Sequence, residues 1–188
     1  MPRIVDFDTT APAEWIGWRT GCGTLAEEAM AQLEGPDEVV AHRLDAVRAL
    51  EKELIDQSLL AGGLWMLDPL GPPVAQFSLG LLTVDPDLNL TPQRLMRKIR
   101  RPEKVRGTRV FDYSTAAGEV SSGPAVVQVE VRGDQDGQVR SCISQTIFPR
   151  GTSDLMRFEY VTHLPGAFVA LSKEAIDIGE SLTVEIGE

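Results

Sequence analysis

The feature that most constrains the fold of this chain is a change in hydrophobic period at Gly62-Gly63. Before these glycines, apolar residues recur at helical steps of four, three, three and four, as Val40, Leu44, Val47, Leu50 and Leu54. This spacing predicts an amphipathic helix that begins at Asp37 and ends near Leu59. After the glycines, apolar residues form short runs or alternate with polar ones, which is the period of β-strands. The chain is therefore expected to change from helix to sheet at this point.

A shorter helix is predicted in front of this one. Thr24 and Glu27 have the spacing of a capping box, in which a hydroxyl and a carboxylate satisfy free backbone N–H groups at a helix start. Gly35-Pro36 is expected to end that helix. Residues 1–60 are accordingly predicted to be the helical N-terminal part of a single α+β domain that spans residues 1–188.

Residues 61–188 are predicted to form a sheet closed by a C-terminal helix. The strand-like runs are 64–67, 74–84, 109–114, 127–131, 139–148 and 155–160. The last helix shows apolar residues at steps of three, four, three and four, as Phe168, Leu171, Ala175, Ile178 and Leu182. Strands and helices are segregated rather than alternating, which is typical of the α+β class. The predicted fold is one antiparallel β-sheet on which the N-terminal helical pair, a short connecting helix and the C-terminal helix pack.

Charge is distributed unevenly along the chain, whose formal net charge is -10. Eight of the 18 basic residues lie between Arg94 and Arg109, and Glu103 is the only acid among them. The remaining residues carry a formal charge of -17, from ten basic and 27 acidic side chains. A body of this charge repels nucleic acid and anionic lipid at long range. The basic stretch is a local exception to this composition.

The basic stretch is predicted to be a short helix followed by an exit loop. Thr91 is a favourable N-cap and Pro92 a favourable first helical residue, and the helix is expected to end before Pro102. Its apolar face consists of Leu95, Met96 and Ile99. The cations left on the outside, with one from the loop, are the candidate partner-binding residues Arg97, Lys98, Arg100, Arg101 and Lys104.

Three interpretations of these cations stay open at this point. They can form a docking surface for an acidic protein, because arginine offers planar, bidentate contacts with carboxylates. They can equally form a solvated face that is paired with neighbouring acids of the same chain. The third is an anion- or nucleic-acid-binding role for Arg94–Arg109, which the acidic body and the scarcity of nearby aromatic residues oppose. No binding of nucleic acid is therefore expected.

The sequence contains no recognisable catalytic, cofactor-binding or metal-binding motif. It lacks the G-x-S-x-G and H-E-x-x-H patterns, a glycine-rich phosphate loop and a complete EF-hand loop. Cys22 and Cys142 have no metal-like spacing and are expected to be reduced thiols. An enzyme that uses Cys142 and His163 as nucleophile and base stays an alternative, because both fall in the predicted C-terminal sheet. No catalytic residue, cofactor or metal is predicted.

Neither a membrane span nor a secretory leader is predicted. No run of about 18 apolar residues occurs. The N-terminal stretch MPRIVDFDTTAPAEW carries early acids and lacks an apolar core. Together with the two expected free thiols, this predicts a cytoplasmic protein.

The order of the elements resembles the PsbP-like superfamily. The residues that carry the resemblance are the runs 122–129, 139–148 and 155–160, the break Leu164-Pro165-Gly166, and the closing helix 168–182 with its Ile178 and Ser181-Leu182. The N-terminal helical pair and the stretch AGGLWMLDP also resemble small actinobacterial proteins. Understood members of the superfamily mostly bind other proteins. The resemblance thus implies a non-enzymatic protein-interaction module or assembly component of bacterial origin, which binds a protein partner or a copy of itself.

Overall fold

The computed structural model describes residues 2–187. Its helices are α1 (Gly23–Gln32), α2 (Asp37–Asp56), α3 (Pro92–Lys98) and α4 (Phe168–Ser181), with 3-10 turns at Pro86–Leu88 and Pro165–Ala167. Its strands are β1 (Arg3–Asp8), β2 (Trp15–Arg19), β3 (Ala61–Trp65), β4 (Ala75–Leu82), β5 (Thr108–Val120), β6 (Gly123–Asp134), β7 (Val139–Ile147), β8 (Leu155–Thr162) and β9 (Thr183–Gly187). The predicted α+β class is confirmed. No helix in this described part is both long enough and apolar enough to cross a membrane.

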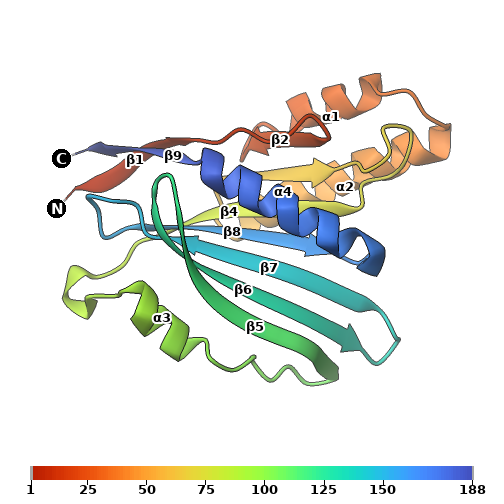
Figure 1. Cartoon of the computed structure of the whole chain (residues 1–188). Coiled ribbons are helices and arrows are strands. Elements are labelled where there is room, and N and C mark those ends of the chain that lie inside the picture. The colour runs from red at the N-terminus through yellow and green to blue at the C-terminus, as the bar shows by residue number, and fades with distance from the viewer. Residues whose placement is uncertain (1, 188) are drawn as a thin grey trace.

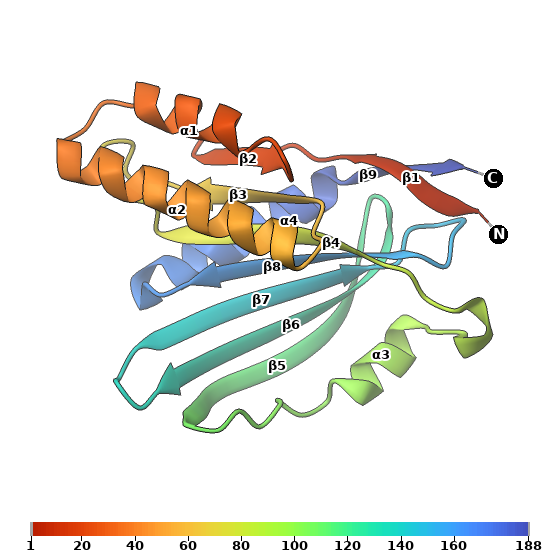
Figure 2. The same ribbon diagram turned by 180° about the vertical axis from the view of Figure 1, so that it is seen from behind.

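A seven-stranded antiparallel sheet forms the centre of the protein, in the order β2-β3-β4-β8-β7-β6-β5. The helix α4 covers one face of this sheet, and α1 and α2 cover the β2–β4 part of the opposite face (Figure 1 and Figure 2). The first and last strands, β1 and β9, pair in a separate two-stranded sheet that brings the two ends of the described chain together (Figure 1). The structure thus adds a second, small sheet to the single sheet that was expected.

Aromatic and aliphatic side chains fill the layer between the large sheet and α4. The predicted apolar stripe of α4 is its buried face, and Leu171 and Ile178 on it are fully enclosed. They belong to one cluster with Phe77 of β4 and Phe158 of β8, whose ring centroids are 6.1 Å apart. Side chains that face α4 alternate along each strand with side chains that face the other way. One face of the central strands is therefore mostly apolar, and Gln145 of β7, which lies against Gly179 of α4, is a buried polar exception.

The layer on the opposite face is smaller and covers only part of the sheet. Leu50 and Leu54 of α2 pack there with Met30 of α1 and Trp18 of β2. The indole Nε1 of Trp18 donates a hydrogen bond to the Glu51 carboxylate on α2 at 2.7 Å. The face of α2 that was predicted to be apolar is thus the face that packs on the sheet.

The N-terminal part is not purely helical, because two strands precede the helical pair. The strand β2 has apolar side chains on both faces, with Trp15 bonded to α4 and Trp18 bonded to α2, so it lacks an alternating pattern. The predicted capping box is also wrong. The helix α1 begins at Gly23 without a side-chain cap, and the Glu27 carboxylate forms a salt bridge with Arg48 of α2 instead.

The glycine pair that was expected to end α2 lies inside β3. The helix ends before these residues, and the chain reverses at Ser58, whose φ is 54°. A Cβ at Gly63 would lie 2.4 Å from the ring of Phe77, and one at Gly62 would lie 2.9 Å from Leu54. The glycines therefore allow β3 to approach both layers closely. In the sequence, a glycine pair required by packing looks the same as a glycine pair that ends a helix.

A fully buried arginine ties α2 to two loops. Arg43 Nε donates to the carbonyl oxygen of Gly71 at 3.0 Å, and Nη2 donates to that of Pro69 at 2.7 Å, both in the β3–β4 turn. Its Nη1 donates to the carbonyl oxygens of Leu33 and Glu34, at 3.3 and 3.1 Å, between α1 and α2. Among the described side chains it has no carboxylate partner. Backbone carbonyl dipoles therefore take the place of water around this buried cation.

Candidate partner-binding site

The stretch Arg94–Arg109, called the basic segment below, forms most of α3, the loop after it and the start of β5. It lies beside the β5 edge of the large sheet (Figure 1). Thr91 caps α3 as predicted, because its Oγ1 accepts a hydrogen bond from the backbone N–H of Arg94 at 3.3 Å, and Pro92 is the first helical residue. The predicted apolar face is only half-buried, since α3 packs at the edge of the sheet. Its residues are Leu95, Met96 and Ile99.

Two side chains of the sheet hold the loop after α3 in place. The Tyr113 hydroxyl donates a hydrogen bond to the carbonyl oxygen of Ile99. Arg132 donates from Nη2 to the carbonyl oxygen of Glu103 at 2.8 Å and from Nη1 to Thr108 Oγ1 at 2.9 Å. Burial, with a smaller effect from a nearby carboxylate, raises the pKa of Tyr113. The phenol therefore keeps its proton and its hydrogen bond at neutral pH.

All cations of the basic segment are exposed, and none forms a salt bridge with another described residue. They are Arg94, Arg97, Lys98, Arg100, Arg101, Lys104, Arg106 and Arg109. Elsewhere, salt bridges engage Arg3, Arg19, Arg48, Lys52, Arg132, Arg140, Arg150 and Arg157. The pairing with neighbouring acids that was one interpretation of these cations does not occur between the described residues. The segment presents its positive charge to solvent.

A polar groove of about 630 Å³ lies between the basic segment and the large sheet. Lys98 and Arg101 belong to its wall, whereas Arg97, Arg100 and Lys104 do not line it. Its floor is the face of β6, β7 and β8 that α4 does not cover. The groove is therefore lined partly by the predicted basic site and partly by a sheet face that was not predicted to belong to a site.

Ion pairs cross the floor of the groove. Arg140 Nη2 on β7 lies 2.7 Å from Glu159 Oε1 on β8, and Arg157 Nη2 lies 3.5 Å from the other oxygen of the same carboxylate. Arg157 Nη2 also donates to Ser144 Oγ at 3.2 Å. These residues were not predicted to belong to a site. The available signal was in the predicted strand 155–160, where Arg157 and Glu159 alternate with Met156, Phe158 and Tyr160. This alternation indicates a sheet face that no helix covers.

The structure does not join Cys142 and His163 into a nucleophile–base pair. Cys142 is buried in the groove floor, with its Sγ 3.8 Å from Ser144 Oγ. Burial, followed by the charge of Glu159, raises the pKa of this thiol to about 11. His163 is exposed just after β8, and no hydrogen bond links it to Cys142 in the described part of the chain. A thiol that keeps its proton at neutral pH is a poor nucleophile.

Within residues 2–187, no three or more His, Cys, Asp or Glu side chains are placed so that they could hold a metal ion. Cys22 and Cys142 are both free thiols.

We expect the raised pKa of Cys142 to make the protein less stable in alkali. The folded state keeps the thiol proton up to about pH 11, whereas the ordinary thiol pKa is 9.0. The unfolded state therefore binds fewer protons between these values, so the free energy of unfolding falls by about 2–3 kcal/mol as the pH rises through this window. Urea unfolding at the two ends of the window should show a smaller fall for Cys142→Ala than for the wild type. Equal falls in the two proteins would contradict the assignment.

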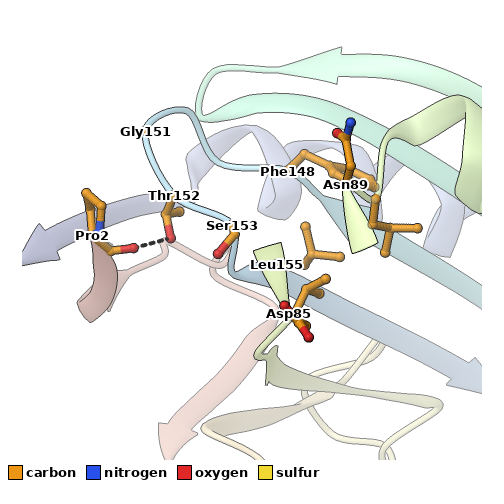
Figure 3. Close-up of a pocket in the computed structure, with 10 residues that line it drawn as sticks. Pro2, Asp85, Asn89, Phe148, Gly151, Thr152, Ser153 and Leu155 are labelled. Atoms are coloured by element: carbon orange, nitrogen blue, oxygen red, sulfur yellow. Dashed lines mark hydrogen bonds between the residues drawn. The ribbon is translucent and has the colours of Figure 1, made fainter. Parts of the chain in front are cut away.

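A second cavity, of about 400 Å³, lies where the N-terminal residues meet the β7–β8 turn and the connection before α3 (Figure 3). Thr152 Oγ1 donates to the carbonyl oxygen of Pro2 at 3.0 Å. Figure 3 shows Asp85 and Asn89 pointing in different directions. The Ser153 hydroxyl is buried and has no hydrogen-bond partner among the described residues. Because these polar groups do not converge on one position, the cavity is a seam between segments and not a candidate site.

No protein-family model matches the sequence, and no curated protein matches it. The solved structures that are similar to the chain include the following two. One is LpqN, described as involved in cell envelope biogenesis of Mycobacterium tuberculosis, with 16% identity, a TM-score of 0.49, and coverage of 98% of this chain and 84% of that chain. The other is the cyanobacterial PsbP (CyanoP) from Synechocystis, with 10% identity, a TM-score of 0.49, and coverage of 97% of this chain and 95% of that chain. At these identities the two likenesses concern the fold alone.

Proposed function

We propose that the protein is a non-enzymatic interaction module that docks an acidic protein surface through the basic segment. The proposed contact residues are Arg97, Lys98, Arg100, Arg101 and Lys104. The observation that carries the proposal is that these exposed cations have no salt bridge among the described residues, although the chain outside the segment has a formal charge of -17. Like charges held together repel one another, and an acidic partner surface relieves this repulsion on binding.

The chemistry of the basic segment suits carboxylates better than phosphates. Six of its eight cations are arginines, and a planar guanidinium binds a carboxylate through two parallel hydrogen bonds. Binding of single-stranded nucleic acid relies on aromatic side chains that stack on bases. Tyr113 is one of the few aromatic residues near the segment, and its hydroxyl is engaged with Ile99. The acidic body also opposes the approach of a dense polyanion.

An enzymatic function at Cys142 and His163 receives no support from the site. The thiol is buried with a raised pKa, and the histidine lies outside the groove. General base activation of a cysteine needs the two side chains within hydrogen-bond reach. The interaction function is therefore the better account of this region.

We also propose that the protein acts in a reducing compartment, the bacterial cytoplasm. Its free cysteines support this, since unpaired thiols are typical of such compartments. Fractionation of cells of the source organism should recover the protein with cytosolic markers. Recovery with envelope markers would contradict the assignment.

Charge reversal of the basic segment should abolish capture of the partner. The test variant is Arg97→Glu, Arg100→Glu and Arg101→Glu, at exposed positions without salt bridges to described residues. The matched control makes the same charge change elsewhere, as Arg48→Glu, Lys52→Glu and Lys173→Glu. Affinity capture from a lysate of the source organism should recover an acidic protein with the wild type and with the control. The test variant should recover at least about tenfold less of this protein. Equal recovery in all three would show that the segment is only a solvated face.

Two further measurements test whether the partner is a second copy of the chain or a nucleic acid. If the partner is a second copy of the chain, light scattering after size-exclusion should show an oligomer that the test variant dissociates. Random oligonucleotides should not bind at physiological salt. Binding that the same substitutions abolish, with log K falling against log salt at a slope of about -3.6 for four phosphate contacts, would replace protein docking with a nucleic-acid role.

A further inference from the structure

We propose that the groove beside the basic segment receives a short acidic peptide segment of the docked partner, whose carboxylates bind Arg140 and Arg157. The inference rests on the proposed function. It adds the chemical class of the ligand and the residues that select it.

Arg140 and Arg157 have hydrogen-bond donors that the protein does not use. Each engages Nη2 alone, with Glu159 and, for Arg157, also with Ser144. Their Nε and Nη1 groups have no acceptor among the described residues, and their side chains are 40% and 43% exposed. Arg132 differs, because its Nε, Nη1 and Nη2 are all engaged. The open guanidinium edges on the floor can therefore take a carboxylate, while Arg132 holds the loop.

The groove is a positively charged site in an acidic protein. The cations that line it are Lys98, Arg101, Arg132, Arg140 and Arg157, and the acids are Glu103, Glu130 and Glu159. Two of these three acids already form salt bridges with floor arginines. The groove thus attracts anions, and a carboxylate ligand would extend a pattern of arginine–carboxylate pairs that is already present.

The size and surroundings of the groove indicate a short peptide. Its volume of about 630 Å³ lies within the roughly 300–1,000 Å³ of small-ligand pockets, too small for a folded domain. A duplex nucleic acid carries about one charge per 1.7 Å, so the acidic body would repel it strongly. An acidic peptide carries fewer and more widely spaced charges.

Fluorescence anisotropy on the full chain tests the assignment with a labelled decapeptide of alternating glutamate and glycine. The groove variant is Arg140→Gln with Arg157→Gln, and the rim variant is Arg97→Gln with Arg100→Gln. The control is Arg19→Gln with Arg150→Gln, two exposed arginines in salt bridges away from the groove. The groove variant should bind about tenfold more weakly or worse than the wild type and the control. The matched glutamine–glycine peptide should not bind.

Cys142 reports on the same site in the unaltered protein. Its side chain lies in the groove floor, whereas Cys22 does not line the groove. Saturating glutamate–glycine peptide should slow alkylation of Cys142 by iodoacetamide at about pH 9, where a larger fraction of thiol is ionised. Alkylation of Cys22 should proceed unchanged. This readout stays informative if a groove variant fails to fold.

The outcomes separate this inference from the proposed function. Weaker binding by the rim variant alone, with unchanged Cys142 alkylation, would overturn the groove assignment and leave docking by the basic segment intact. Weaker binding by the groove variant alone, with Cys142 protected, would support the groove and remove the rim arginines from the proposed contacts. Equal weakening in the control, or tighter binding of an oligodeoxythymidine than of the acidic peptide, would overturn the inference.

Discussion

Replacing Arg43 by methionine should lower the free energy of unfolding by about 3–5 kcal/mol, a large part of the stability of an ordinary domain. The guanidinium is fully buried and donates to four backbone carbonyl oxygens in two loops. Methionine fills similar space but removes all four hydrogen bonds, each of which contributes about 0.5–1.5 kcal/mol. Urea unfolding followed by tryptophan fluorescence measures the change, because Trp18 packs in the adjoining layer.

The matched control for this prediction is Arg48→Met. Arg48 lies on the same helix, but its side chain is 58% exposed and pairs with Glu27 at the surface. Surface salt bridges are worth about 0–1 kcal/mol, so this control should change stability little. A loss at Arg43 no larger than that of the control would show that the four hydrogen bonds do not hold the loops together.

Truncation after Gly166 should leave the protein unfolded. We propose that the whole chain is one domain and that α4 closes its core. The truncation removes Leu171, Ile178 and Leu182, all fully buried. Burial of such a side chain stabilises a protein by about 1.5–3 kcal/mol, so three of them approach the stability of the domain. Circular dichroism and thermal melting measure the result.

A shorter truncation, after Leu182, serves as the control. It removes β9 and leaves β1 unpaired, but keeps α4 and the large sheet. This protein should melt cooperatively at a lower temperature than the wild type. If the protein truncated after Gly166 melted cooperatively at the wild-type temperature, the role of α4 would be contradicted.

The sequence predicted the elements in which buried residues recur at a fixed, short spacing along the chain. The stripes of α2 and α4 are the faces that the structure buries, because side chains three and four residues apart share one side of a helix. The cap of α3 was equally readable, since Thr91 and Pro92 act through neighbours within one turn. The alternating valines of β6 predicted a strand for the same local reason.

The elements that escaped prediction depend on partners distant in the chain. The strands β1 and β9 pair Arg3 with Gly187, and neither has a distinctive local pattern. Gly62-Gly63 reads as a helix stop, yet it is required by contacts with Phe77 and Leu54. The groove floor arises only when the register of β7 and β8 places Ser144 opposite Glu159, so no single segment of sequence displays it.

Zero-length carbodiimide cross-linking tests the central claim, docking of an acidic partner on the basic segment, most directly. The reagent joins a lysine amine to a carboxylate only when the two are in contact. The chain has four lysines, Lys52, Lys98, Lys104 and Lys173. Mass spectrometry of the cross-linked complex should find Lys98 or Lys104 joined to aspartate or glutamate of the partner. Cross-links from Lys52 or Lys173 alone would contradict the account.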